Sequence, residues 1–249
     1  MKKERLLIVT GGNRGIGRQI ALSALDAGWR VAISYGLNQK LASDMEMASN
    51  GRIKAFPLDV TKSKSISDFF KEIVKEMGPA DALVTAAGID NGERPVAELD
   101  HEFIMSTMKI NVVGLILCCQ EFAKQAIDAA RPGIVVNVSS MAATIGGRMH
   151  KTVYAASKGA VDVFTIGAAK ELAPHGISLF SVRPGVTRTD MTEKALADTK
   201  TKLQIEASIA CGSVAEPSDI ATPVINLISG NFNYASGSML NLGGGGFVI

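Results

Sequence analysis

The sequence of 249 residues predicts an α/β fold with three layers, built around a doubly wound parallel sheet of about seven strands. Short apolar runs alternate along the chain with longer amphipathic stretches, as repeated βα units require. A glycine-rich turn joins the first apolar run to the first amphipathic stretch. No low-complexity linker or long charge run divides the chain, so we expect residues 1–249 to form one domain around a large core.

Seven apolar runs are the candidate strands, and their lengths suit strands that are buried on both faces. In chain order they are Leu6–Thr10, Arg30–Tyr35, Ile53–Leu58, Ala82–Thr85, Gly133–Ser139, Ile177–Arg183 and Ser238–Asn241. Between them, an apolar helix is expected over Ile104–Cys119, with Asn111 inside it. A second helix is expected over Tyr154–Leu172, where apolar residues recur at helical spacing until Pro174 and Gly176 end it.

Composition and charge exclude several classes of function. The 26 basic and 24 acidic residues leave a net charge of +2, which predicts neither a nucleic-acid surface nor binding to an anionic membrane. The first apolar run is too short for a secretory signal, and Ile110–Cys119 is shorter than the roughly 20 residues that cross a membrane. The three cysteines form no CxxC pair, since Cys118 and Cys119 are adjacent and Cys211 lies far away, and the three histidines are scattered, so we expect no metal site. We expect a cytoplasmic protein that acts on a small molecule.

The turn between the first strand and the first helix predicts a nucleotide site. Glycine allows positive φ and lets the backbone approach a diphosphate closely, while the helix N-terminus directs free N–H groups at the anion. A glycine turn that serves chain geometry alone is the other interpretation. The spacing of its glycines differs from the GxGxxG pattern of long dehydrogenases. The candidate contacts are Gly11, Gly12, Asn13, Arg14, Gly15, Ile16 and Gly17.

The end of the second strand indicates which nucleotide is bound. NAD enzymes commonly place a carboxylate there, which accepts hydrogen bonds from the adenosine ribose. The chain has Tyr35 and Asn38 in this stretch and no acidic residue. Arg14 can pair with a 2′-phosphate, so the sequence favours NADP(H) over NAD(H). Gly36 stands where a basic residue follows this strand in many NADP enzymes, which leaves Arg14 as the main support for that preference.

Further cofactor contacts are expected where other strands end. The Asp59 carboxylate can accept a hydrogen bond from the adenine amine, or it can cap the next helix. Small residues after the fourth strand let a ribose approach the backbone, and a rigid turn with hydroxyls after the sixth can bracket the nicotinamide amide. The glycine run 243–246 is either a flexible tail or a tight turn near the nucleotide. The contacts from these strand ends are Asp59, Val60, Ala86, Ala87, Gly88, Pro184, Gly185, Thr187 and Thr189.

Tyr154 and Lys158 are the candidate acid–base pair. They are four residues apart in the predicted helix and share one face. At about 6 Å and an effective dielectric near 20, the lysine charge is worth about 3 kcal/mol, or roughly two pKa units at the phenol. Ser140, just after a strand, can donate to a substrate carbonyl, with Ser139 as a rival. Asn111 can hold a water that links Lys158 to solvent.

Together these motifs resemble the short-chain dehydrogenase/reductase family over nearly the whole chain. The resemblance implies a Rossmann fold, a nicotinamide cofactor, the catalytic set Asn111, Ser140, Tyr154 and Lys158, and commonly a homotetramer built on the two long helices. The sequence departs from the family pattern after the fourth strand, where Thr85-Ala86-Ala87-Gly88 stands in place of Asn-Asn-Ala-Gly. Anchoring of the sheet at this point must therefore come from other residues.

The resemblance implies an NADP(H)-dependent oxidoreductase that interconverts a carbonyl and a secondary alcohol by hydride transfer. The overall pattern is similar to that of 3-oxoacyl-[acyl-carrier-protein] reductases, which implies a substrate bound to acyl-carrier protein. Sugar and small-alcohol dehydrogenases on the same scaffold are an alternative, and so is a regulator that senses NADP(H) without turnover. An epimerase or dehydratase is disfavoured, because few residues follow Pro184. We expect a lid over residues 187–212, and its mixture of apolar and polar side chains does not decide the substrate.

Overall fold

A computed structural model describes residues 4–246, and it confirms the predicted α/β fold. Its parallel strands form one sheet in the order β3-β2-β1-β4-β5-β6-β7. They are β1 (Leu6–Thr10), β2 (Arg30–Tyr35), β3 (Ile53–Pro57), β4 (Ala82–Thr85), β5 (Gly133–Val138), β6 (Ile177–Pro184) and β7 (Met239–Leu242). Three of the seven predicted ranges agree at both ends, and the others differ by one residue at one or both ends.

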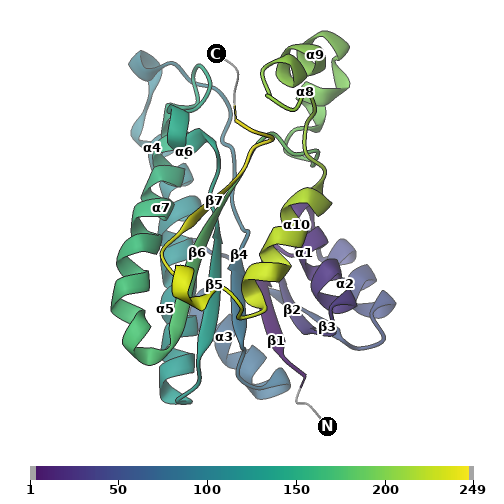
Figure 1. Ribbon diagram of the computed structural model, residues 1–249, viewed down its shortest axis with the longest axis vertical. Helices are drawn as coiled ribbons and strands as arrows, with labels where there is room; N and C mark the ends of the chain where they lie inside the picture. Colours follow the sequence, from purple (N-terminus) through teal and green to yellow (C-terminus); the bar gives the residue numbers. More distant parts are fainter. Residues whose placement is uncertain (1–3, 247–249) are drawn as a thin grey trace.

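Helices cover both faces of this sheet (Figure 1). One face is covered by α3 (Ser63–Met77), α5 (Leu115–Asp128) and α7 (Thr152–Leu172). The other is covered by α1 (Gly15–Asp26), α2 (Gln39–Ala48) and α10 (Pro217–Ile228). This arrangement gives the three layers that the alternating pattern of the sequence predicts.

The central strands are mostly apolar because they contribute side chains to two cores. Along β1, Leu6 and Ile8 belong to the core under α3, α5 and α7, whereas Leu7 and Val9 belong to the core under α1, α2 and α10. Successive side chains of a strand point to opposite faces, so no position of a central strand faces water. Each such buried side chain contributes about 1.5–3 kcal/mol to folding.

The order of the strands fixes where a ligand can bind. The chain starts at β1 and runs outward through β2 to β3, and it then returns to the other side of β1 as β4. The loops after β1 and β4 therefore diverge at the carboxyl edge and leave a crevice between them, the usual ligand site of open α/β sheets.

The predicted helix around Asn111 is divided into three parts. It comprises α4 (His101–Met108), a π-helical turn η2 (Lys109–Gly114) and α5. The turn lies where the helix approaches the loop after β3, since a Cβ on Gly114 would be only 2.6 Å from the Val60 carbonyl oxygen. The whole stretch His101–Asp128 is long and apolar enough to cross a membrane by length and composition alone. Its inward face nevertheless packs in the core, at Cys118, Cys119 and Phe122 among others.

The remaining helices of the described chain are the two helices of the lid and four short helices in other loops. The lid over residues 187–212 contains α8 (Glu193–Ala197) and α9 (Thr199–Ala207), which stand above the carboxyl edge of the sheet in Figure 1. Its own small apolar cluster includes Leu196 and Ile205. The remaining elements are α6 (Ala142–Ile145), η1 (Val96–Glu98), η3 (Ala173–His175) and η4 (Asn233–Ala235).

Candidate active site

A cleft of about 2070 Å³ runs along the carboxyl edge of the sheet. It is lined by the loops after β1, β3, β4, β5 and β6 and by one face of the lid. The cleft brings together almost all of the site residues predicted from the sequence. Of these, the exceptions in the described chain are Gly12, Tyr35 and Asn111, which do not line it.

The loop after β1 is shaped by close backbone contacts. Gly11 has φ = 65°, in the left-handed region that favours glycine, and a Cβ on Gly17 would lie 2.4 Å from the Gly11 carbonyl oxygen. Gly12 turns to the sheet instead, where its Cβ would meet the Ile33 side chain at 2.7 Å. No side chain caps α1, so the N–H groups of its first turn are left for a ligand in the cleft.

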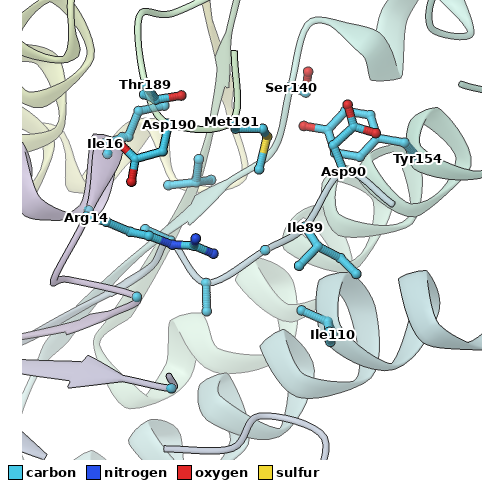
Figure 2. Close-up of a pocket in the computed structure, with 18 of the residues that line it drawn as sticks. Arg14, Ile16, Ile89, Asp90, Ile110, Ser140, Tyr154, Thr189, Asp190 and Met191 are labelled. Atoms are coloured by element: carbon cyan, nitrogen blue, oxygen red, sulfur yellow. The ribbon is translucent and has the colours of Figure 1, made fainter. Parts of the chain in front are cut away.

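The end of β2 presents Ser34 to the cleft in place of Tyr35. Alternation along the strand turns Tyr35 toward the core under α1, whereas the buried Ser34 hydroxyl accepts a hydrogen bond from the Gly11 amide at 2.9 Å. Asn13 donates to the Asn38 carbonyl at 3.1 Å and joins the two loops. Arg14 is exposed, and Figure 2 shows its side chain extending into the cleft.

Asp59 is held ionised at the adenine side of the expected site. Its carboxylate accepts hydrogen bonds from the Thr61 amide at 3.0 Å and the Thr61 hydroxyl at 2.6 Å, and it pairs with Lys62 at 3.0 Å. These partners lower its pKa to about 2. Asp59 therefore organises the turn after β3, and the N-cap position of α3 is Lys62. Val60 lines the cleft beside it and packs against the core.

The departure from the family pattern after β4 is compensated by the neighbouring strand. The Thr85 hydroxyl donates to the side-chain oxygen Oδ1 of Asn137 on β5 at 2.8 Å, and the Ala87 amide donates to the Thr10 hydroxyl of β1 at 3.2 Å. Anchoring thus comes from hydroxyls on β1 and β4 and one amide on β5. Ala86, Ala87 and Gly88 line the cleft as expected.

Tyr154 and Ser140 lie beside each other on one wall of the cleft. Figure 2 shows the two side chains close together, with Asp90 beside them and Arg14 on the opposite side. Removal of the phenol from water raises the pKa of Tyr154, a hydrogen bond with Ser140 opposes this, and the charge of Asp90 adds to it. Without a bound cofactor the balance therefore favours the neutral phenol, opposite to the shift that we expected from Lys158 alone.

Ser140 and Ser139 have different surroundings. Ser140 accepts a hydrogen bond from the Ala142 amide at 3.1 Å, which leaves its own hydroxyl proton free to point at Tyr154 or a substrate. The Ser139 hydroxyl donates to the Lys158 carbonyl at 3.0 Å and is buried. Ser139 therefore joins β5 to α7, and Ser140 is the serine that is available for chemistry.

Lys158 lies under the ring of Tyr154. Its ammonium is 5.8 Å from the ring centroid and donates to the Val138 carbonyl at 2.8 Å. Burial lowers the pKa of Lys158 to about 8, although the charge of Asp162 acts in the opposite direction. A lysine with this pKa is still mostly charged at neutral pH, so it can both donate to a ligand and stabilise a phenolate.

Asn111 is used to fix the loop after β4. Its side chain accepts from the Ile89 amide at 2.9 Å and donates to the Ile89 carbonyl at 2.9 Å and to the Ser157 hydroxyl at 3.1 Å. Both N–H groups of the amide are engaged, so only its oxygen has room for a further partner. Asn111 connects the π-helical turn to Ile89 and α7, close behind Lys158.

The turn after β6 and the glycine run lie side by side. Pro184, Gly185, Thr187 and Thr189 all line the cleft, and a Cβ on Gly15 would lie 3.4 Å from the Thr189 side chain. A Cβ on Gly243 would be 2.9 Å from Met141. The backbone of Gly244 and Gly246 accepts from Cys211 and Ala210, so the run is a tight turn against the lid and not a free tail.

Several residues of the substrate side were not predicted. Lys151 pairs with both carboxylate oxygens of Asp90, at 2.8 and 2.7 Å, and the two side chains close one wall of the cleft near Tyr154. Met191 of the lid also faces this space (Figure 2). Asp90 follows Gly88 by only two residues, which is a signal from the sequence, but its partner Lys151 is 61 residues further along.

Comparison with known proteins shows the family and the fold of the chain. Residues 5–200 match a model of the short chain dehydrogenase family. The chain is 32% identical to the 3-oxoacyl-[acyl-carrier-protein] reductase FabG of Staphylococcus aureus strain Mu50, with all of both chains covered. It is also 32% identical to an L-rhamnose 1-dehydrogenase (NAD(P)(+)) of Sphingomonas sp. strain SKA58, with 98% of this chain and 96% of the other covered. The solved structure of ElxO with NADP bound superposes with a TM-score of 0.89 at 27% identity, covering 98% of each chain.

Proposed function

This chain belongs to the short-chain dehydrogenase family, and on that premise we propose that it transfers hydride between NADP(H) and a carbonyl/secondary alcohol pair. One observation carries the proposal. Ser140, Tyr154 and Lys158 meet on one wall of a cleft whose opposite end is the glycine loop with its uncapped helix. A donor for a carbonyl oxygen, an acid–base group and a buried cation thus lie within reach of one nucleotide site.

The cleft fits a dinucleotide. The close approach of Gly11 and Gly17 forms a cradle that any added Cβ would fill, and the first turn of α1 offers N–H groups to a diphosphate. A bound nicotinamide supplies or accepts the hydride. Ala86, Ala87 and Gly88 line the cleft where they would border the ribose, and Pro184, Gly185, Thr187 and Thr189 line it where they would hold the nicotinamide amide.

Arg14 supports a preference for the phosphorylated cofactor. It extends into the cleft near the end of β2, where no carboxylate stands to repel a 2′-phosphate. A guanidinium there gains a charge-assisted contact with NADPH that NADH does not offer. Arg14→Gln is expected to weaken NADPH binding at least about tenfold, which corresponds to about 1.4 kcal/mol, and to leave NADH binding within twofold. Equal losses for both cofactors would contradict this role.

The chain's own residues divide the chemistry among them. Ser140 donates to the substrate oxygen and stabilises the negative charge that develops there during reduction. Tyr154 gives its proton to that oxygen, and the neutral phenol favoured in the free protein is the form that this direction requires. Lys158 stabilises the resulting phenolate. Asn111 fixes the loop at Ile89 next to Lys158. The second lone pair of its amide oxygen is the candidate anchor of a relay water.

Two substrate classes compete for the site. A 3-oxoacyl thioester, carried by acyl-carrier protein, is supported by the full-length similarity to the FabG reductase. A sugar or small alcohol is supported by the similarity to the rhamnose dehydrogenase and by the charged Asp90–Lys151 pair in the wall near Tyr154. The first class needs a long apolar path, whereas the second gains from polar groups that bind hydroxyls.

A homotetramer is part of the same proposal. The family resemblance leads us to expect that the two long helices around Asn111 and Tyr154 pair between copies of the chain. Val113 in η2 and Val163 in α7 are 48% and 70% exposed. Burying such side chains between copies of the chain would remove apolar surface from water. The location in the cytoplasm, expected from composition, stays a prediction that fractionation of the source cells would test.

A substrate panel tests the proposed function. Purified protein is mixed with NADPH or NADH and, in turn, a 3-oxoacyl thioester, a small ketone and a sugar lactone, and oxidation is followed at the nicotinamide absorbance. We expect carbonyl-dependent oxidation that is faster with NADPH for at least one class. Cofactor binding without turnover on any carbonyl or alcohol, in either direction, would contradict the proposal.

A further inference from the structure

A buried acidic residue lies one helical turn beyond Lys158. Asp162 follows Lys158 by four residues on α7, so the two side chains share a face of the helix. Asp162 is only 3% exposed and Lys158 only 5% exposed. No ion pair joins them in the part of the chain that the structure describes, because the ammonium donates to the Val138 carbonyl. Asp162 therefore acts on Lys158 through space.

Two donors from β6 hold the Asp162 carboxylate in place. The Ser181 hydroxyl donates to one oxygen at 2.7 Å, and the Arg183 Nε donates to the other at 2.8 Å. Arg183 is in turn 3.3 Å from the Asn241 side chain on β7. A carboxylate with both oxygens satisfied is stable as an anion in the interior, where an unpaired one is costly.

The position of this anion has a consequence for the acid–base group. An ammonium that is taken out of water tends to lose its proton, and a nearby negative charge restores it. We propose that Asp162 is a positioning residue that keeps the buried Lys158 ammonium charged, and that Arg183 and Ser181 serve to hold it there. The inference rests on the proposed role of Lys158 in the reaction.

The other charged groups near Lys158 act differently. Tyr154 on the same helix is its target, and Asp90 in the loop after β4 acts on Tyr154 and is paired with Lys151. Arg183 is positive and opposes the charge of Lys158, so it cannot be the group that sustains it. Of these groups, Asp162 alone combines a negative charge, burial and a place on the same helical face.

The direct test is the pKa of Lys158 in the cofactor-free protein. Lysine labelled with 13C at Cε is titrated by NMR, and the Lys158 signal is assigned from the Lys158→Arg variant. From a wild-type pKa of about 8, Asp162→Asn is expected to lower the value by about one to two units, since a charge is lost at helical i,i+4 distance. Asp162→Glu disturbs the packing but keeps the charge, so the wild-type value should be largely retained.

Two further variants separate the electrostatic role from a structural one. Asp162→Asn leaves the partly buried Arg183 without its carboxylate partner, so the double variant with Arg183→Met serves if the single one fails to fold. Its Lys158 pKa should lie below that of the wild type and above that of Asp162→Asn. Asp81→Asn removes a similar partly buried carboxylate that pairs with Arg131 at the other edge of the sheet, and it should leave Lys158 unchanged.

Activity gives a second readout where turnover is found. Lys158 must be protonated, so kcat/KM is high below its pKa and falls as pH rises through it. Asp162→Asn should move this fall to lower pH by the same one to two units. An unchanged Lys158 pKa in folded Asp162→Asn protein would overturn the inference, even if carbonyl reduction is found. Absence of turnover with the NMR shift intact would instead count against the proposed function alone.

Discussion

Gly17 is the position where one added methyl group tests the nucleotide loop most sharply. Its Cβ would lie 2.4 Å from the Gly11 carbonyl oxygen and 3.3 Å from the Ala86 Cβ. The first contact is about 1 Å shorter than ordinary van der Waals distance, and the atom met is backbone, so no side chain can move aside. In Gly17→Ala, the start of α1 must therefore shift away from the loop after β1.

The size of the effect follows from this overlap. Overpacking of a well-packed site costs about 1–3 kcal/mol, which for a chain of this length lowers Tm by about 2–12 °C. The same shift moves the N–H groups that face the diphosphate, so we expect Kd for NADPH to rise at least about tenfold, or about 1.4 kcal/mol. Stability and cofactor affinity should be lost together.

Gly167→Ala is the matched control. Gly167 lies in the middle of α7, is exposed, and has nothing within 4 Å of its added Cβ. Alanine is favoured over glycine in a helix by about 0.5–1 kcal/mol, so this variant should bind NADPH as well as the wild type. Compared at the same oligomeric state, it should also melt slightly above the wild type. Thermal unfolding by circular dichroism and cofactor titration by fluorescence measure both quantities. Wild-type Tm and affinity in Gly17→Ala would refute the close contact between helix and loop.

Three further predictions concern single side chains. Ser140→Ala should lower kcat by about 10²–10³-fold with little change in cofactor Kd, and steady-state kinetics would contradict the role if kcat fell less than threefold. The depressed pKa of Asp59 contributes stability that is complete above about pH 4 and is lost as pH falls toward about 2, so Asp59→Asn should flatten acid unfolding curves in that window; parallel curves would count against it. Thr85→Val leaves the buried Asn137 oxygen without its hydroxyl partner and should cost about 1–3 kcal/mol in urea unfolding, and an unchanged midpoint would mean that β4 and β5 are anchored elsewhere.

The strands and the main groups of the cleft were predictable from the sequence for a physical reason. Strands buried on both faces are mostly apolar runs, so they stand out from the amphipathic stretches between them. Motif residues that follow such strands, Ser140 among them, reach the same edge of the sheet because every strand is parallel. Tyr154 and Lys158 are four residues apart in a predicted helix, so the sequence also predicts that they share one face.

The features that sequence reasoning missed depend on neighbours that are far apart in the chain. Successive side chains of β2 point to opposite faces of the sheet. Tyr35 therefore points away from the cleft, and Ser34 points toward it. The π-helical turn at Asn111 depends on the approach of the helix to Val60, which no local pattern records. Asp162 had a signal that was overlooked, since a carboxylate on the apolar face of a helix needs buried partners.

Tyr154→Phe tests the central claim, that one phenol beside Ser140 and Lys158 moves the proton, most directly. The substitution removes a single oxygen and keeps the ring that lies over Lys158. We predict that carbonyl-dependent NADPH oxidation falls by at least about 10²-fold, while Kd for NADPH stays within about threefold of the wild type. A Tyr154→Phe protein that keeps more than a few per cent of wild-type turnover would contradict the account.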